Sequence, residues 1–172
     1  LTRLAKACGA KSAAAVVKGI VDNQHWLADG GIDTSARVAE FLAQACLETD
    51  YFKTLKEYWG PTKAQSGYEG RKDLGNTQPG DGKRFMGRDV IQVTGRANYR
   101  ALSKWAGFDF EAKPEALESP DWLGIGAIWY FLTRKGLIDY ARAGNIAMVT
   151  RRVNGGLNGY AARPGKYAAA AP

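Results

Sequence analysis

Residues 70–96 have the sequence GRKDLGNTQPGDGKRFMGRDVIQVTGR, and this glycine-rich stretch separates the helical patterns that precede it from those that follow it. It overlaps a loop segment, 60–87, that is rich in residues that interrupt helices and strands. These residues are Gly60, Pro61, Gly67, Gly70, Gly75, Pro79, Gly80, Gly82 and Gly87. A loop this long in a compact domain is usually functional or disordered. Its apolar residues Tyr68, Leu74 and Phe85 favour an ordered, functional loop.

Helical patterns precede the loop. Apolar residues recur at intervals of three and four over 12–28 and again over about 33–52, which predicts two amphipathic helices. Gly30 and Gly31 end the first of them, and Asp33 or Thr34 can cap the second.

Helical patterns also follow the loop. We expect helices over 97–106, 121–135 and 145–153, the last capped by Asn145, and a short strand over 90–94. Because helices dominate on both sides of the loop, the fold class is mainly α.

Size and composition predict one globular domain. The chain has 172 residues, of which 45% are hydrophobic and 24% charged. Its longest uncharged stretch, 122–133, is too short for a bilayer span, so we expect none. The first 18 residues include Arg3, Lys6, Lys11 and Lys18, a pattern that does not predict a signal peptide.

The net charge of +7 points to an anionic target. Nucleic acid, anionic lipid and acidic cell-wall polymers all qualify on charge alone. The basic residues are spread along the chain rather than gathered in blocks, so we expect a diffuse electrostatic preference and no dedicated nucleic-acid site.

Histidine and cysteine are too few for the usual zinc or nucleophile chemistry. His25 has no flanking catalytic signature and is expected to be a polar residue on the first helix. Cys8 and Cys46 stand outside any paired motif, and we expect two free buried thiols rather than a bridge. The sequence thus predicts no metal and no cofactor, and leaves acid–base chemistry to Asp and Glu.

Two glutamates are the candidates for that chemistry. Glu48 lies two helical turns after Phe41, at the edge of an apolar stripe, where partial burial would raise its pKa as a general acid requires. Glu69 lies in the glycine-rich loop, where a solvated carboxylate could act as a base on water. A carboxylate that merely flanks the stripe, and an ordinary loop glutamate, remain the alternatives.

Several motifs carry a resemblance to a known family. They are FLAQ at 41–44, ET at 48–49, YEGRKDLGNTQPGDGKRF at 68–85, GR at 87–88, IQVTGR at 91–96, NY at 98–99 and VNGG at 153–156. Over about residues 30–165 the chain resembles glycoside hydrolase family 19. Within it, the chain resembles the chitinase-like endolysins of phages and prophages of Gram-negative bacteria.

The resemblance implies a bilobal, lysozyme-like α fold with a cleft for β-1,4-linked amino sugars. It also implies inverting hydrolysis, in which an acid and a base flank the scissile bond. Glu48 takes the position of the acid, Glu69 that of the base, and Thr94 that of the residue holding the attacking water. The positions expected to contact substrate or orient the carboxylates are Tyr68, Arg88, Gln92, Asn98, Tyr99, Asn154 and Arg163. For the side-chain amides of Gln92, Asn98 and Asn154, capping of backbone groups is the alternative role.

The chain departs from the family at two points. Leu47 stands where a histidine usually precedes the acid, and Asp89 stands where a glycine is common. A carboxylate at 89 could pair with Arg88 or alter a subsite. The disulfides of plant chitinases are also missing, which fits synthesis in a reducing cytoplasm.

The leading hypothesis is a single catalytic domain, 1–172, without a separate wall-binding domain. We expect a monomeric endolysin that hydrolyses peptidoglycan, gathers in the host cytoplasm and reaches the periplasm through a holin-type pore. A chitinase acting on N-acetylglucosamine polymers is the first alternative. A non-catalytic amino-sugar-binding module is an alternative of another class, and a nucleic-acid-binding protein is the weakest.

Overall fold

The computed structural model describes residues 13–34, 38, 41, 55–134, 136–143 and 145–154, and this part of the chain is mainly helical. The α-helices are α2 (Ala13–Asp22), α3 (Gln24–Asp29), α5 (Lys63–Ser66), α6 (Asp81–Arg84), α7 (Arg96–Ala106), α8 (Ile125–Thr133), α9 (Leu137–Arg142) and α10 (Ile146–Asn154). Three 3₁₀ turns complete them: η1 (Lys72–Leu74), η2 (Pro114–Glu118) and η3 (Pro120–Trp122). No helix in these ranges has the length and apolar character that crossing a membrane requires.

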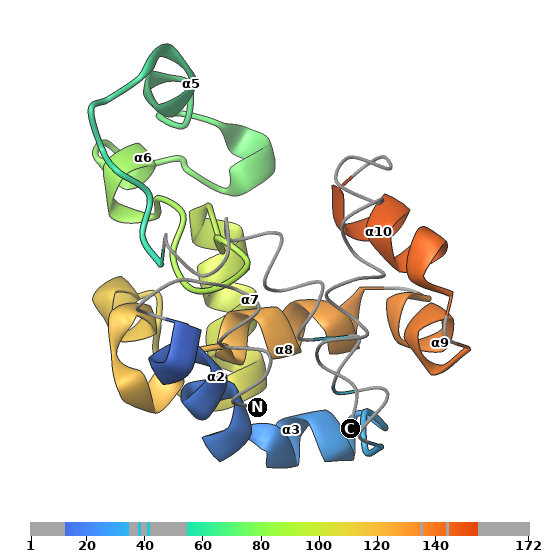
Figure 1. Ribbon diagram of the computed structural model, residues 1–172. Coiled ribbons are helices and arrows are strands. Elements are labelled where there is room, and N and C mark those ends of the chain that lie inside the picture. Colours follow the sequence, from blue (N-terminus) through green and yellow to red (C-terminus); the bar gives the residue numbers. More distant parts are fainter. Residues whose placement is uncertain are drawn as a thin grey trace.

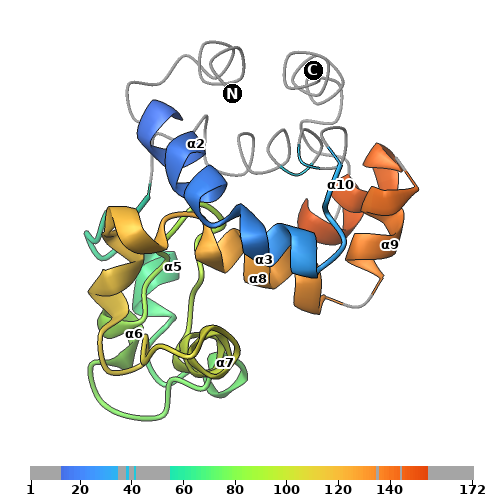
Figure 2. The same cartoon turned by 90° about the horizontal axis from the view of Figure 1, so that it is seen from below.

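Helix α8 is the centre of the described structure. In both views the α5–α6 segment and the α9–α10 pair lie towards opposite ends of α8 (Figures 1 and 2). Its sequence, IGAIWYFLT, has no charged residue, and nearly every side is buried. A helix that is apolar all round belongs in the interior, where each face meets a different partner.

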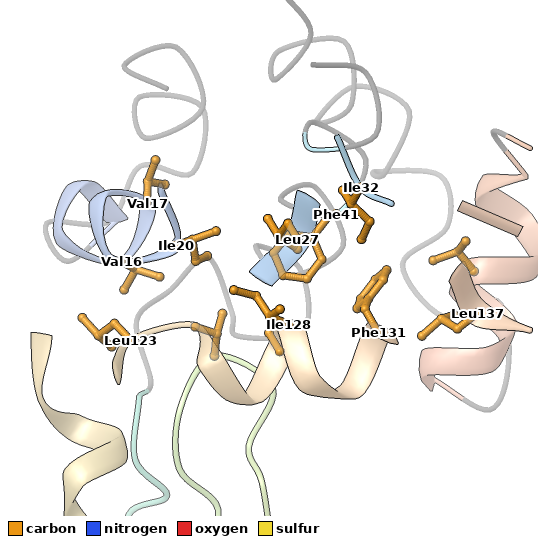
Figure 3. Packing of buried hydrophobic residues seen from close by; sticks show 13 residues of the cluster. Val16, Val17, Ile20, Leu27, Ile32, Phe41, Leu123, Ile128, Phe131 and Leu137 are labelled. Carbon is orange, nitrogen blue, oxygen red and sulfur yellow. The ribbon is translucent and has the colours of Figure 1, made fainter. Parts of the chain in front are cut away.

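One face of α8 packs on the N-terminal helices. Ile128 and Phe131 meet Ile20 of α2, Leu27 of α3 and Phe41 in one buried cluster (Figure 3). The rings of Phe41 and Phe131 lie edge to face with centroids 4.8 Å apart. The cluster continues to Leu137 and Val149, so α9 and α10 share this core.

Another face of α8 packs on α7 and the loop. Ile125 and Trp129 join Tyr99 and Leu102 of α7 in a second buried cluster. Phe85, from the glycine-rich segment, is fully buried in the same cluster. The loop is therefore anchored by an aromatic side chain, as the sequence predicted.

A buried carboxylate joins the loop to the start of α8. Asp89 Oδ1 accepts a hydrogen bond from Gly124 N (2.7 Å), and Oδ2 accepts from Gly126 N (2.8 Å) and Ala127 N (3.2 Å). These are first-turn N–H groups that have no partner within a helix. Gly124 has no side chain to cap them, so a residue 35 positions away in sequence supplies the cap.

Two glycines make room for this contact. A Cβ atom at Gly126 would lie 2.7 Å from Asp89 Oδ2 and 2.6 Å from Val93 Cγ2. Gly124 has a φ of +84°, a backbone conformation that residues other than glycine rarely adopt. Gly126 therefore leaves space for the carboxylate itself, whereas Gly124 allows the backbone turn that begins α8.

Two predicted helices are confirmed. The helix expected over 97–106 is α7, and Gly107 ends it in the left-handed conformation (φ +70°). The helix expected over 145–153 is α10, and Asn145 Oδ1 caps it by accepting from Met148 N (3.1 Å). In each helix a local sequence signal predicts one boundary, Gly107 after α7 and Asn145 before α10.

Other predictions need correction. The helix expected over 12–28 is two helices that break at Asn23, whose side chain donates to Gly19 O. The strand expected over 90–94 is a turn closed by an isolated bridge between Arg88 and Val93. The helix expected over 121–135 is shorter, because the left-handed Gly124 separates η3 from α8. Most of the helix expected over 33–52 lies outside the described residues.

Replacing Asp89 by alanine should destabilise the fold strongly. At least three buried N–H groups would lose their acceptor, and each unsatisfied buried group costs about 1–3 kcal/mol. We expect Asp89→Ala to lower the free energy of unfolding by about 3 kcal/mol or more, measured by urea denaturation. The matched control is Asp22→Ala, which removes an exposed ion pair with Lys18 and should change stability by less than about 1 kcal/mol. Similar losses in the two variants would contradict the assigned role.

Asp89 should also give stability a distinctive pH dependence. Burial raises the pKa of Asp89 to about 6, and backbone N–H groups only partly counter it. An unfolded aspartate titrates near pH 3.9, so between about pH 4 and pH 6 the folded chain binds this proton more tightly.

The part of the stability that comes from binding this proton is therefore full below about pH 4 and is lost as pH rises through about 6. We expect the free energy of unfolding of the wild type to fall across this window relative to that of Asp89→Asn, which does not titrate. Denaturation of both proteins at several pH values measures the difference. Parallel curves would refute the shifted titration.

Candidate active site

A tight turn between Arg88 and Val93 presents the first candidate residues. Arg88 N donates to Val93 O (3.2 Å), Val93 N donates to Arg88 O (2.7 Å), and Gln92 N donates to Asp89 O (3.1 Å). Asp89 and Gln92 have φ values of +62° and +56°, which are unusual for residues with a side chain. Such backbone strain concentrates at functional sites, and here the buried contacts of Asp89 hold it in place.

Three predicted site residues line one small pocket. Gln92, Thr94 and Asn98 border a space of about 150 Å³. The remaining described lining residues are Leu74, Ile91, Val93, Trp129, Tyr130 and Arg134. The pocket thus lies where the turn, the start of α7 and the end of α8 meet.

Hydrogen bonds fix the polar side chains of this pocket. Thr94 Oγ1 donates to Gln92 O (2.8 Å), Gln92 Nε2 donates to Asp89 O (3.1 Å), and Asn98 Nδ2 donates to Thr94 O (2.7 Å). The side-chain N–H groups of Gln92 and Asn98 therefore bind backbone carbonyls. This is the capping role that the sequence left open as the alternative to contacting substrate. Asn98 keeps its side-chain oxygen without a partner among the described residues, so it can still accept a bond from a ligand.

Glu69 is exposed, yet its carboxylate is held at both oxygens. Oε1 accepts from Gly80 N (2.6 Å) and Oε2 accepts from Gly82 N (2.8 Å). A Cβ atom at Gly82 would lie 2.8 Å from Oε2, so the glycine allows the carboxylate to approach. Glu69 belongs to a firmly placed turn, but it does not line the small pocket.

An ion-pair network braces this turn. The guanidinium of Arg96 binds both oxygens of the buried Asp81 and also reaches Glu111 Oε1 (3.0 Å). Arg100 binds Glu111 as well, and these two arginines lower the pKa of Glu111 to about 2. Because Asp81 stands between Gly80 and Gly82, the network fixes the N–H groups that hold Glu69.

A larger hollow of about 740 Å³ lies beside this network. Three of its charged wall residues, Asp81, Arg96 and Glu111, are paired with one another. The other two, Arg84 and Asp109, bind backbone groups of 111–112. None of the predicted site residues is among its described lining. The smaller pocket is therefore the better candidate site, despite its size.

Glu57 is a carboxylate that sequence reasoning missed. It is half-buried; Oε2 accepts from Gly87 N (3.1 Å) and Oε1 accepts from the hydroxyl of Tyr68 (3.3 Å). Gly87 also lies against the pocket: a Cβ atom there would be 2.7 Å from Gln92 Oε1 and 3.2 Å from Thr94 Oγ1. Glu57 is thus separated from two pocket residues by one glycine.

Tyr68 lies beside this carboxylate. Its ring centroid is 6.4 Å from that of Trp59, and burial, followed by the nearby charge of Glu57, raises the pKa of its hydroxyl. The sequence signal for Glu57 was its place directly before the aromatic pair Tyr58-Trp59. Its neighbour Lys56 made it resemble an ordinary surface charge.

Arg88 and Tyr99 require a correction. Both are buried, and a buried side chain cannot contact a polysaccharide. Arg88 pairs with Glu118 (2.7 Å) and donates to the Tyr99 hydroxyl (3.1 Å), which itself donates to Met86 O (2.8 Å). Burial raises the pKa of Tyr99 to about 12, so it stays a neutral donor. These residues hold the loop on α7, and neither is among the described residues that line the small pocket.

Asp89 is likewise not a partner of Arg88, because its carboxylate points to α8 and is taken up by the N–H groups there. Glu48, Leu47, Arg163, Cys8 and Cys46 lie outside the described residues, as does the side chain of Asn154. Within the described ranges, no group of three or more His, Cys, Asp or Glu residues is arranged to hold a metal ion.

Comparison with known proteins shows a relative by sequence. No family model matches the chain. A segment of 93 residues is 40% identical to a "Glycosyl hydrolase family 19 domain-containing protein" of Haemophilus influenzae. The match covers 54% of this chain and 44% of that protein, so the chain spans under half the length of this curated relative.

The fold gives a second, independent likeness. Chitinase C from Streptomyces griseus superposes with a TM-score of 0.67 at 21% identity, over 87% of this chain and 79% of that one. A glutamate-to-glutamine mutant of chitinase C gives the same TM-score at 19% identity, over 89% and 81%. The 93-residue match confirms the predicted resemblance to glycoside hydrolase family 19, and the chain shares its fold with the chitinase C structures.

Proposed function

We propose that this protein hydrolyses the β-1,4 bonds of peptidoglycan by an inverting mechanism with two carboxylates. The observation that carries the proposal is the pocket at the Arg88–Val93 turn. It brings together Gln92, Thr94 and Asn98, and a carboxylate, Glu57, lies one glycine away. The sequence match to a family 19 protein and the chitinase fold support the same class of reaction.

In this mechanism an acid protonates the leaving glycosidic oxygen while a base deprotonates water on the opposite face of the sugar. Glu48 remains the proposed acid, on the sequence motif alone. Thr94 is placed to hold the water, since its hydroxyl borders the pocket and its own proton is directed to Gln92 O. The hydroxyl oxygen is then available as an acceptor.

Two described carboxylates are candidates for the base. Glu69 is the residue that the motif indicates, and its oxygens accept from Gly80 N and Gly82 N. Both oxygens of Glu57 also accept hydrogen bonds, and neither glutamate is among the described residues that line the pocket. Glu57 is half-buried and is linked through Gly87 to the Gln92 and Thr94 side chains. The geometry favours Glu57, with Glu69 acting to fix its turn.

The choice of polymer rests on charge. The net charge of +7 attracts the chain to an acidic wall, whereas chitin carries no charge. The chitinase neighbours favour chitin as the second candidate substrate. For peptidoglycan hydrolysis we propose the following setting. The protein is an endolysin that is made in a host cytoplasm and reaches the wall through a holin-type pore.

Single substitutions of the three glutamates distinguish their roles. We expect Glu48→Gln and Glu57→Gln each to lower kcat by about 10²–10⁴-fold, the usual contribution of a general acid or base. Glu69→Gln should lower it by less than about tenfold. Glu115→Gln, an exposed glutamate away from the pocket, is the matched control and should leave kcat unchanged.

The assay is mass spectrometry of products from purified Gram-negative peptidoglycan and from chitin oligomers. Soluble muropeptides with reducing N-acetylmuramic acid ends would support the proposal, and ¹H NMR of freshly released products, recorded before mutarotation, would test inversion at the new anomeric centre. A severe loss in Glu69→Gln with none in Glu57→Gln would restore Glu69 as the base. Cleavage of chitin alone would make the protein a chitinase, and cleavage of neither polymer would favour a binding module.

A further inference from the structure

Arg134 is the cation of the candidate pocket. It follows the last residue of α8, and its backbone N–H donates to Tyr130 O (3.1 Å). Its guanidinium carbon lies 4.8 Å from the centroid of the Tyr130 ring. This cation–π contact restrains a long side chain whose outer part remains exposed to solvent.

The charge of Arg134 has no counterpart in the part of the chain that is described. Four other arginines are paired with carboxylates: Arg71 with Asp73, Arg88 with Glu118, and Arg96 and Arg100 with Glu111. Arg134 forms no such pair, and no Asp or Glu is among the described residues that line its pocket. Its N–H donors are therefore open to an acceptor brought by a ligand.

The surroundings of Arg134 suit a carboxylate. The planar guanidinium presents paired donors that match the two oxygens of a carboxylate. Trp129, Tyr130 and Ile91 provide partly apolar walls, which exclude water and strengthen such a contact. At about 150 Å³ the pocket has the volume of about five water molecules, so it admits a side group of a polymer rather than several sugar residues.

We propose that Arg134 binds a carboxylate carried by the sugar strand and thereby selects peptidoglycan over uncharged chitin. The inference rests on the proposed function, since it assigns a specificity residue to the same site. In peptidoglycan the carboxylate is that of the lactyl ether where muramic acid carries no peptide, and that of the peptide where the lactyl group is amide-linked to one. In both cases the recognised chemistry is an acidic appendage on a β-1,4-linked amino-sugar strand.

A purely structural role for Arg134 is the competing explanation. Basic residues stabilise the C-terminal end of a helix by interaction with its dipole. Lys104 occupies the corresponding place in the last turn of α7, is exposed and does not line the pocket. Lys104→Gln is therefore a matched control that removes a helix-end charge without touching the site.

The test compares three oligosaccharides of equal length with wild type, Arg134→Gln, Arg134→Lys and Lys104→Gln. The first substrate alternates N-acetylglucosamine with N-acetylmuramic acid, the second is the same strand with its lactyl carboxylates amidated, and the third is a chitin oligomer. We expect Arg134→Gln to lower kcat/KM about tenfold on the first, mainly through KM, and less than twofold on the other two. Arg134→Lys should recover part of the loss, and Lys104→Gln should match wild type on all three.

A strand bearing peptides identifies the source of the carboxylate. A loss in Arg134→Gln that is confined to the peptide-bearing strand would assign the contact to a peptide carboxylate. An equal loss on all substrates would show a structural role, and no loss on either acidic strand would also overturn the proposal.

Binding keeps the two proposals separate. If wild type cleaves none of the strands, the proposed function fails, and NMR titration with the same oligosaccharides then tests Arg134 alone. Weaker binding of the acidic strand by Arg134→Gln, with unchanged binding of the amidated strand, would still support the carboxylate site. Equal binding of both strands by wild type and variant would overturn it.

Discussion

The carboxylate of Asp89 lies at the N-terminus of α8, and the geometry of the candidate pocket depends on this contact. The aspartate accepts from Gly124, Gly126 and Ala127, because Gly126 leaves space for the carboxylate and Gly124 allows the turn that begins the helix. In doing so it holds a turn whose residue Gln92 adopts a left-handed backbone conformation. Gln92 and Thr94 are consequently presented beside Trp129 and Tyr130 of the same helix. A position that departs from the family pattern thus serves to join the loop to the core.

Polar anchors repeat this principle along the glycine-rich segment. Asn76 is fully buried and joins Tyr68 O to the backbone N–H of Arg96. Arg88 and Asp81 are also buried and paired. A segment with so many glycines has little apolar side-chain surface to bury, so hydrogen bonds and ion pairs replace part of the hydrophobic core. Hydrogen bonds and ion pairs of this kind form only in one arrangement of the backbone, and a pocket that binds a polar ligand needs such a fixed arrangement.

Local signals were enough to predict much of the fold. Gly107 marks the end of α7, Asn145 marks the start of α10, and the helical pattern over 121–135 predicted the segment that contains α8. Contacts between distant residues were not predictable in this way. Asp89 meets α8 from 35 positions away, and Glu57 meets Gly87 from 30 positions away. The motif resemblance named Gln92, Thr94 and Asn98, which line one pocket, but it gave no information on burial, and Tyr99 lies fully buried outside that pocket.

The position of α8 between two cores has a consequence for how the molecule comes apart. Ile128 and Phe131 belong to the cluster with α2 and α3, whereas Ile125 and Trp129 belong to the cluster with α7. Loss of either partner would expose one side of an uncharged helix to water. Neither the N-terminal helices nor the loop and α7 can therefore retain a stable hydrophobic interior alone. The described part of the chain is expected to unfold cooperatively, without an intermediate in which one core persists after the other has melted.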